Sequence, residues 1–67
     1  MKAKTKRAIE RYATTEVKRI RRARGDIFTE VNLLPFWNKR PREERDYYLN
    51  LIMVSWENGQ RDDAGHK

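Results

Sequence analysis

The chain has 67 residues with no cysteine and one histidine, which excludes disulfides, thiolate metal ligands, cysteine nucleophiles and a histidine-based zinc site or triad. Sixteen Lys and Arg against ten Asp and Glu give a net charge of +6. A chain this short buries only about 60% of the surface that it exposes when unfolded, so a partner or second copy is a usual source of extra stability. We therefore expect a small basic binding protein without a cofactor, and not an enzyme.

The first third of the chain is a predicted helix from about residue 3 to 24. Apolar residues recur there at spacings of three and four, as on one face of a helix: Ile9, Tyr12, Ala13, Val17, Ile20 and Ala23. Glu16 falls inside this apolar arc, where we expect it to pair with Arg19 or with a cation on another element. Gly25 predicts the end of the helix, because glycine tolerates the left-handed conformation that follows many helices.

A short second helix is predicted over residues 27–34. Asp26 is a favourable N-cap, and the apolar residues that follow have helical spacing: Ile27, Phe28, Val31 and Leu34. Pro35 ends the helix, since the residue before a proline avoids the helical region. A strand is the alternative, because Ile27, Val31 and Leu33 also fit an alternating pattern.

The third predicted helix starts at Pro41, with acidic residues in its first turn, and ends near Asn58-Gly59. Apolar side chains surround most of this helix. One amphipathic helix and one short helix cannot cover so much apolar surface, so we expect a homodimer through the third helix. The expected interface residues are Tyr47, Tyr48, Leu51, Ile52 and Trp56. The chain is thus predicted to be all-α, with one small three-helix domain over 1–59 and a disordered polar tail over 60–67.

The positive charge is concentrated in the first helix. Residues 1–25 hold ten basic and two acidic side chains, whereas residues 26–67 hold six basic and eight acidic ones. A helix face of one charge sign is suited to contact with phosphates, which releases counterions. We expect nucleic-acid binding through the cations Lys4, Arg7, Arg11, Lys18, Arg21 and Arg22.

The expected binding is directed at the nucleic-acid backbone and serves a regulatory or architectural role. The chain has no zinc-finger, KH or RRM signature, and its third helix is too apolar and acidic at its start to read a major groove. Trp37, beside Phe36 in a loop with Lys39 and Arg40, is a candidate for stacking on a base. The favoured interpretation is that these two aromatics cover the core with Phe28 and Trp56, since small domains commonly need aromatic side chains there. The sequence leaves DNA and RNA equally open.

A second function remains open from sequence. The same cations suit an acidic protein surface, as expected of a small inhibitor or adaptor of the kind that phages and mobile elements encode. The chain has no run of about 18 apolar residues, as a membrane span requires, and no apolar run behind its basic N-terminus, as a signal peptide requires. We therefore expect no membrane association and a cytoplasmic location, in the host cytoplasm if the protein is viral.

Overall fold

The computed structural model describes the backbone of residues 1–65 and the side chains of residues 1–59. The α-helices are α1 (Ala3–Arg22), α2 (Ile27–Glu30) and α3 (Arg42–Gly65), and a short 3-10 helix, η1, spans Trp37–Lys39. This described part contains no strand. The predicted all-α fold of three helices is therefore confirmed, and the strand alternative for residues 27–34 is wrong.

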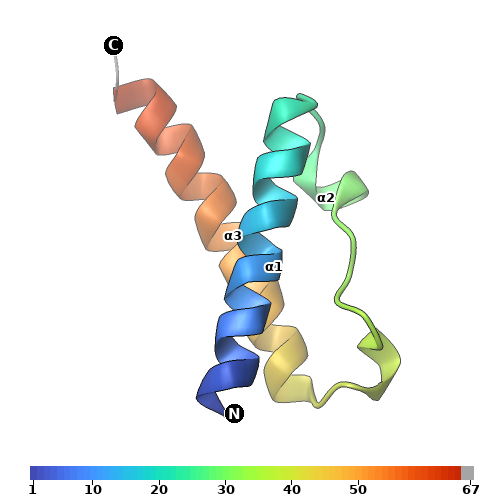
Figure 1. The fold of residues 1–67 in the computed structure, drawn as a ribbon. Coiled ribbons are helices and arrows are strands. Elements are labelled where there is room, and N and C mark those ends of the chain that lie inside the picture. The colour runs from blue at the N-terminus through green and yellow to red at the C-terminus, as the bar shows by residue number, and fades with distance from the viewer. Residues whose placement is uncertain (66–67) are drawn as a thin grey trace.

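The two long helices lie side by side and run in the same direction, as Figure 1 shows. The amino group of Met1 pairs with Glu43 at 3.3 Å near the start of both helices, and Arg21 bonds the Trp56 carbonyl at 3.0 Å further along. Parallel neighbours need a long return connection, and α2, η1 and the intervening chain form it along one side of the pair.

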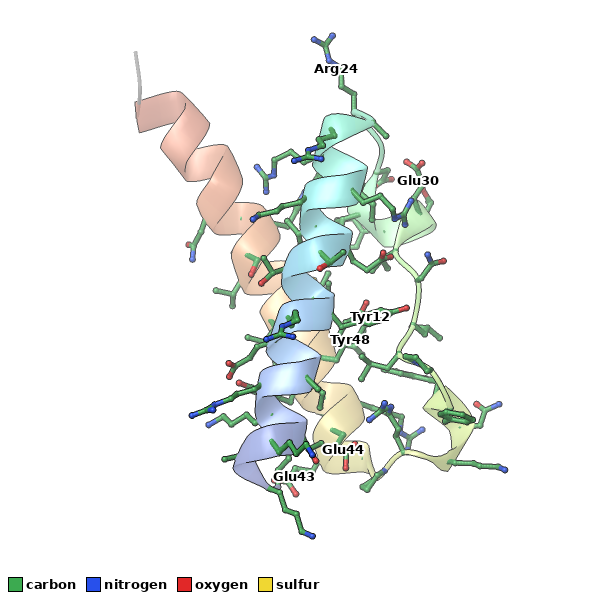
Figure 2. The ribbon with its side chains drawn as sticks, in the orientation of Figure 1. Tyr12, Arg24, Glu30, Glu43, Glu44 and Tyr48 are labelled. Carbon is green, nitrogen blue, oxygen red and sulfur yellow. The ribbon has the colours of Figure 1, made fainter. Side chains whose placement is uncertain are left out.

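The core lies between α1, α3 and this return connection. Its eight buried apolar residues are Ile9, Ala13, Val17, Ile20, Ile27, Leu34, Tyr48 and Ile52. Tyr48 has no exposed surface, and its ring meets the rings of Tyr12 and Trp37 edge-on with 5.9 Å between ring centres; Figure 2 labels Tyr12 and Tyr48. Each fully buried Ile, Leu or Val side chain of the core stabilises the fold by about 1.5–3 kcal/mol. The predicted apolar face of α1 is thus confirmed, apart from the exposed Ala23.

Helix α1 ends at Arg22, earlier than the predicted end near residue 24. Arg24, and not Gly25, takes the left-handed conformation, with φ 55°. The Gly25 N–H bonds the Ile20 carbonyl at 2.9 Å and the Arg24 N–H bonds the Arg21 carbonyl at 3.1 Å, which is the Schellman pattern. A Cβ at Gly25 would lie 1.9 Å from Oε2 of Glu30, so a larger residue there would displace that carboxylate.

Helix α2 is a single turn, shorter than the predicted helix over 27–34. Asp26 caps it as expected, since its carboxylate accepts the Phe28 N–H at 3.0 Å. Val31 is extended, and residues 31–34 form neither helix nor strand. Side chains from other helices bind the backbone there: the Asn32 N–H donates to Glu16, and its carbonyl accepts from Tyr48. Ile27 is buried, but Phe28, expected on the apolar face, is 71% exposed.

Helix α3 begins as predicted and ends later. The Pro41 carbonyl accepts the first bonds of the helix, and two glutamates lie in its first turn. The predicted end at Asn58-Gly59 is wrong, since α3 continues to Gly65. The sequence also predicts a disordered tail over residues 60–67. The side chains of residues 60–65 and the whole of residues 66–67 lie outside the described residues, so disorder there stays a prediction. No helix within residues 1–65 is long and apolar enough to cross a membrane.

Candidate nucleic-acid interface

Five cations form a stripe along the outer face of α1. At 100° per residue, they fall within an arc of about 60° that lies opposite the buried face of the helix. All five side chains are exposed, and we call them the α1 stripe: Lys4, Arg7, Arg11, Lys18 and Arg22. From Lys4 to Arg22 the stripe is about 27 Å long, at 1.5 Å per residue.

Two threonines separate the stripe into two groups of cations. The hydroxyl of Thr14 donates to the Glu10 carbonyl, and that of Thr15 donates to the Arg11 carbonyl, both at 2.9 Å. Both hydroxyl protons are thus used within the helix. The donors that the stripe offers to a ligand are therefore ammonium and guanidinium groups.

Both carboxylates of α1 point away from the stripe. Glu10 accepts a hydrogen bond from the hydroxyl of Tyr47 on α3, and Glu16 is buried beneath the return connection. Among the side chains of residues 1–59, none forms an ion pair with a cation of the stripe. The positive charge of this face is thus not neutralised by neighbouring acids in that part of the chain.

Arg21 does not belong to the stripe, although the sequence grouped it with these cations. Its Nη2 donates to the Trp56 carbonyl at 3.0 Å, and its guanidinium lies 4.8 Å from the centre of the Trp56 ring. A Cβ at Gly59 would lie 2.2 Å from the same guanidinium. Arg21 therefore faces α3 and joins the two long helices.

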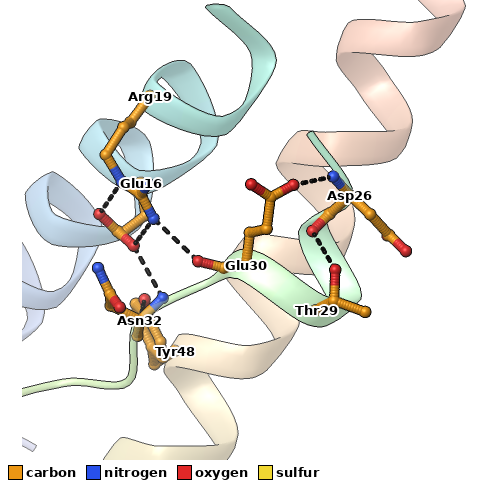
Figure 3. A network of polar contacts seen from close by, with 7 residues as sticks. All are labelled: Glu16, Arg19, Asp26, Thr29, Glu30, Asn32 and Tyr48. Carbon is orange, nitrogen blue, oxygen red and sulfur yellow. Dashed lines mark hydrogen bonds and ion pairs between the residues drawn. The ribbon is translucent and has the colours of Figure 1, made fainter. Parts of the chain in front are cut away.

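The buried Glu16 holds the return connection against α1 (Figure 3). Its carboxylate accepts two hydrogen bonds from Arg19 at 3.0 Å and one from the Asn32 N–H at 2.8 Å. Arg19 also donates to the Glu30 carbonyl at 2.9 Å. The hydrogen bond from Arg19 is the main reason that the pKa of Glu16 lies below its ordinary value of 4.5. The expected pair of Glu16 with Arg19 is confirmed.

The residues expected at a dimer interface are largely covered within one chain. Tyr48 and Ile52 lie in the core, and burial raises the pKa of the Tyr48 phenol well above its ordinary value of 10.0. Tyr47, Leu51 and Trp56 are partly buried against that core. The hydrogen bond to Glu10 raises the pKa of Tyr47. The large apolar side chains that α3 exposes among the described residues are instead Leu49, Met53 and Val54.

The two adjacent aromatics of the loop have different surroundings. The ring of Trp37, the residue expected to stack on a base, lies edge-on against Tyr48 and is partly buried. Phe36 is 77% exposed. The sequence could not separate them, because which of two neighbouring side chains faces the core depends on the backbone conformation of the turn.

The described side chains contain no group of three or more His, Cys, Asp or Glu residues that could hold a metal ion. Comparisons with protein-family models, with curated proteins and with solved structures found no match to this chain. The α1 stripe and its surroundings are therefore the features that indicate a function.

Proposed function

We propose that the protein binds nucleic acid through the α1 stripe, in a regulatory or architectural role in the cytoplasm. The observation that carries the proposal is the arrangement of five exposed cations on one helix face, with both acids of that helix directed elsewhere. Each cation that neutralises a phosphate releases a counterion, and this release supplies most of the affinity in non-specific binding.

The chemistry of the stripe favours phosphates over bases. The sequence of α1 contains no Asn or Gln, the side chains that read adenine with two hydrogen bonds. The Thr14 and Thr15 hydroxyls donate to the helix backbone. Phosphate contacts position a protein on nucleic acid without selecting a sequence. We therefore expect weak sequence preference.

Two double variants test the proposal with equal loss of charge. Arg7→Gln with Arg11→Gln removes two cations of the stripe, and Lys2→Gln with Arg42→Gln removes two exposed cations outside it. Two lost phosphate contacts lower affinity for a DNA duplex roughly 100-fold at about 50 mM salt, by counterion release. We expect this loss of affinity in the Arg7→Gln, Arg11→Gln variant and a far smaller loss in the Lys2→Gln, Arg42→Gln control. Fluorescence anisotropy measures both affinities. Equal losses in both variants would contradict the proposal.

An acidic protein surface is the second candidate partner, and one observation favours it. Phe28 is 71% exposed on α2, and Leu33 is 47% exposed nearby in the chain. Exposed large apolar side chains are common where proteins contact each other. A partner captured from lysate that stays bound after nuclease treatment, and is lost with Phe28→Ser, would support this candidate. Loss of capture on nuclease treatment would support nucleic acid.

A further inference from the structure

Phe36 combines high exposure with an unfavourable backbone conformation. Its side chain is 77% exposed, and its backbone is left-handed, with φ 59° and ψ 34°. A bulky residue rarely adopts this conformation, which glycine or asparagine occupies more easily. The Phe36 ring is not part of the hydrophobic core. A strained, exposed aromatic residue of this kind is more often found at a binding site than in a purely structural turn.

The turn that carries Phe36 is held in place by several contacts. Nε of Arg40 donates to the Pro35 carbonyl, and its Nη1 pairs with Glu44 on α3, both at 2.8 Å. The Lys39 N–H bonds the Phe36 carbonyl at 2.9 Å. Trp37 packs against Tyr48 on the inner side. The exposed ring is thus presented on a fixed turn, which lowers the entropy lost when a ligand binds to it.

The charges around the turn favour an anionic ligand. The two nearest acids at the start of α3 are neutralised: Glu44 by Arg40, and Glu43 by the amino terminus at 3.3 Å (Figure 2 labels both acids). Lys39 is exposed on the turn itself. Among the described side chains the turn thus carries one cation without an acidic partner, Lys39, and one exposed ring, Phe36, which suits a phosphate-linked base better than an uncharged protein pocket.

The turn also adjoins the α1 stripe. Lys4, the first cation of the stripe, lines a shallow depression together with Pro35 and Arg40. Ala8 and Tyr12 of α1 line the same depression. Cations of the stripe and the turn therefore border one surface, which a single strand of nucleic acid can follow from phosphate to phosphate.

We propose that Phe36 stacks on an unpaired base of a nucleic acid whose backbone lies on the α1 stripe. This inference rests on the proposed function and extends it, because it assigns single-stranded nucleic acid, or a duplex with unpaired bases, as the preferred ligand. Every base has a flat aromatic face, so stacking adds affinity without selecting a sequence. Trp37, the other aromatic of the turn, then supports the turn from the core side.

Three single variants of the full-length protein test the stacking. Phe36→Leu keeps an apolar side chain without an aromatic face, Phe36→Tyr keeps the face, and Phe28→Leu alters an equally exposed ring outside the turn. The probes are a thymidine oligonucleotide and a fully paired duplex of equal length. Phe36→Leu is expected to weaken binding of the oligonucleotide about 5- to 100-fold, as the loss of one stacked base does. Phe36→Tyr, Phe28→Leu and duplex binding are expected to stay unchanged.

The outcomes separate this inference from the proposed function. Unchanged oligonucleotide binding by Phe36→Leu would overturn the stacking, while loss of binding in the stripe variant would still support the function. An equal effect of Phe36→Leu on both probes would also overturn the stacking of an unpaired base. If the wild-type protein binds neither probe, both proposals fail. Quenching of 2-aminopurine within the oligonucleotide, lost in Phe36→Leu and kept in Phe36→Tyr, would support stacking directly.

Discussion

The guanidinium of Arg21 on α1 lies where a side chain at position 59 of α3 would otherwise be. A Cβ on Gly59 would approach its atoms to 2.2 Å, and without one the guanidinium reaches the Trp56 carbonyl at 3.0 Å and lies 4.8 Å from the Trp56 ring centre. The neighbouring Arg22 lies about 100° further round α1 and is exposed. Arg21 thus packs between the two long helices, whereas Arg22 belongs to the α1 stripe, for which we propose nucleic-acid binding.

The first prediction distinguishes the roles of Arg21 and Arg22. Arg21→Gln is expected to lower the free energy of unfolding by about 1–2 kcal/mol, because it removes a cation–π contact and a charged hydrogen bond between the helices. Arg22→Gln is expected to leave stability unchanged and to weaken nucleic-acid binding. Urea unfolding and anisotropy titration of both variants check this, and a reversed pattern would contradict the placement of the two side chains.

The second prediction concerns Glu16 and pH. Glu16→Gln is expected to destabilise the protein by about 1–3 kcal/mol at neutral pH, because the buried hydrogen bonds to Arg19 and Asn32 lose their charged acceptor. The pKa of Glu16 is lowered in the folded protein, so the ionised form stabilises the fold above the ordinary pKa of 4.5 and loses this effect as pH falls through the folded pKa. The urea midpoints of wild type and variant should therefore converge as pH falls below the ordinary pKa of 4.5. A difference in urea midpoint that stays constant from neutral to acid pH would contradict this prediction.

The third prediction concerns the end of α1. Arg24→Gly is expected to raise the free energy of unfolding by about 1 kcal/mol, since glycine adopts the left-handed conformation without the Cβ penalty. Gly25→Ala should have the opposite effect, because its Cβ would displace the Glu30 carboxylate, which accepts the Asp26 N–H at 2.6 Å. Thermal unfolding of both variants provides the measurement. Destabilisation by Arg24→Gly would contradict the left-handed placement of Arg24, and stabilisation by Gly25→Ala would contradict the importance of the Glu30 contact.

The fourth prediction concerns self-association through α3. Leu49, Met53 and Val54 are 42%, 43% and 54% exposed, and we expect a second copy to cover them. Met53→Lys should then give a folded monomer. Ile52→Asp should unfold the chain, because Ile52 is only 4% exposed and belongs to the core. Sedimentation and circular dichroism distinguish these results, and a wild-type monomer at micromolar concentration would refute self-association.

Local sequence patterns predicted the long helices and the stripe because both follow from helical periodicity. The spacing of Ile9, Ala13, Val17 and Ile20 determines the buried face of α1. The cations of the α1 stripe are at helical positions that place them on the opposite face. Asp26 was likewise a reliable N-cap, since capping involves only neighbouring residues. Glu16 was identifiable as an exception to the apolar face, with Arg19 one turn away.

The remaining features depend on contacts between distant residues. Residues 31–34 are not helical, and Glu16 and Tyr48 bind the backbone of Asn32 there, which no local propensity encodes. Gly59 resembled a helix end but provides space for Arg21. Tyr48 and Ile52, which the sequence assigns to a dimer interface, are instead buried within one chain, where Tyr48 contacts Tyr12 of α1 and Trp37 of the return connection.

Binding of phosphates by the α1 stripe is tested most directly by the salt dependence of affinity for a DNA duplex. Five neutralised phosphates predict a slope of log affinity against log salt of about −4.5, and loss of Arg7 and Arg11 should reduce its magnitude by about two. A slope near zero, or the absence of detectable binding to any duplex or single strand at about 50 mM salt, would contradict nucleic-acid binding by this helix.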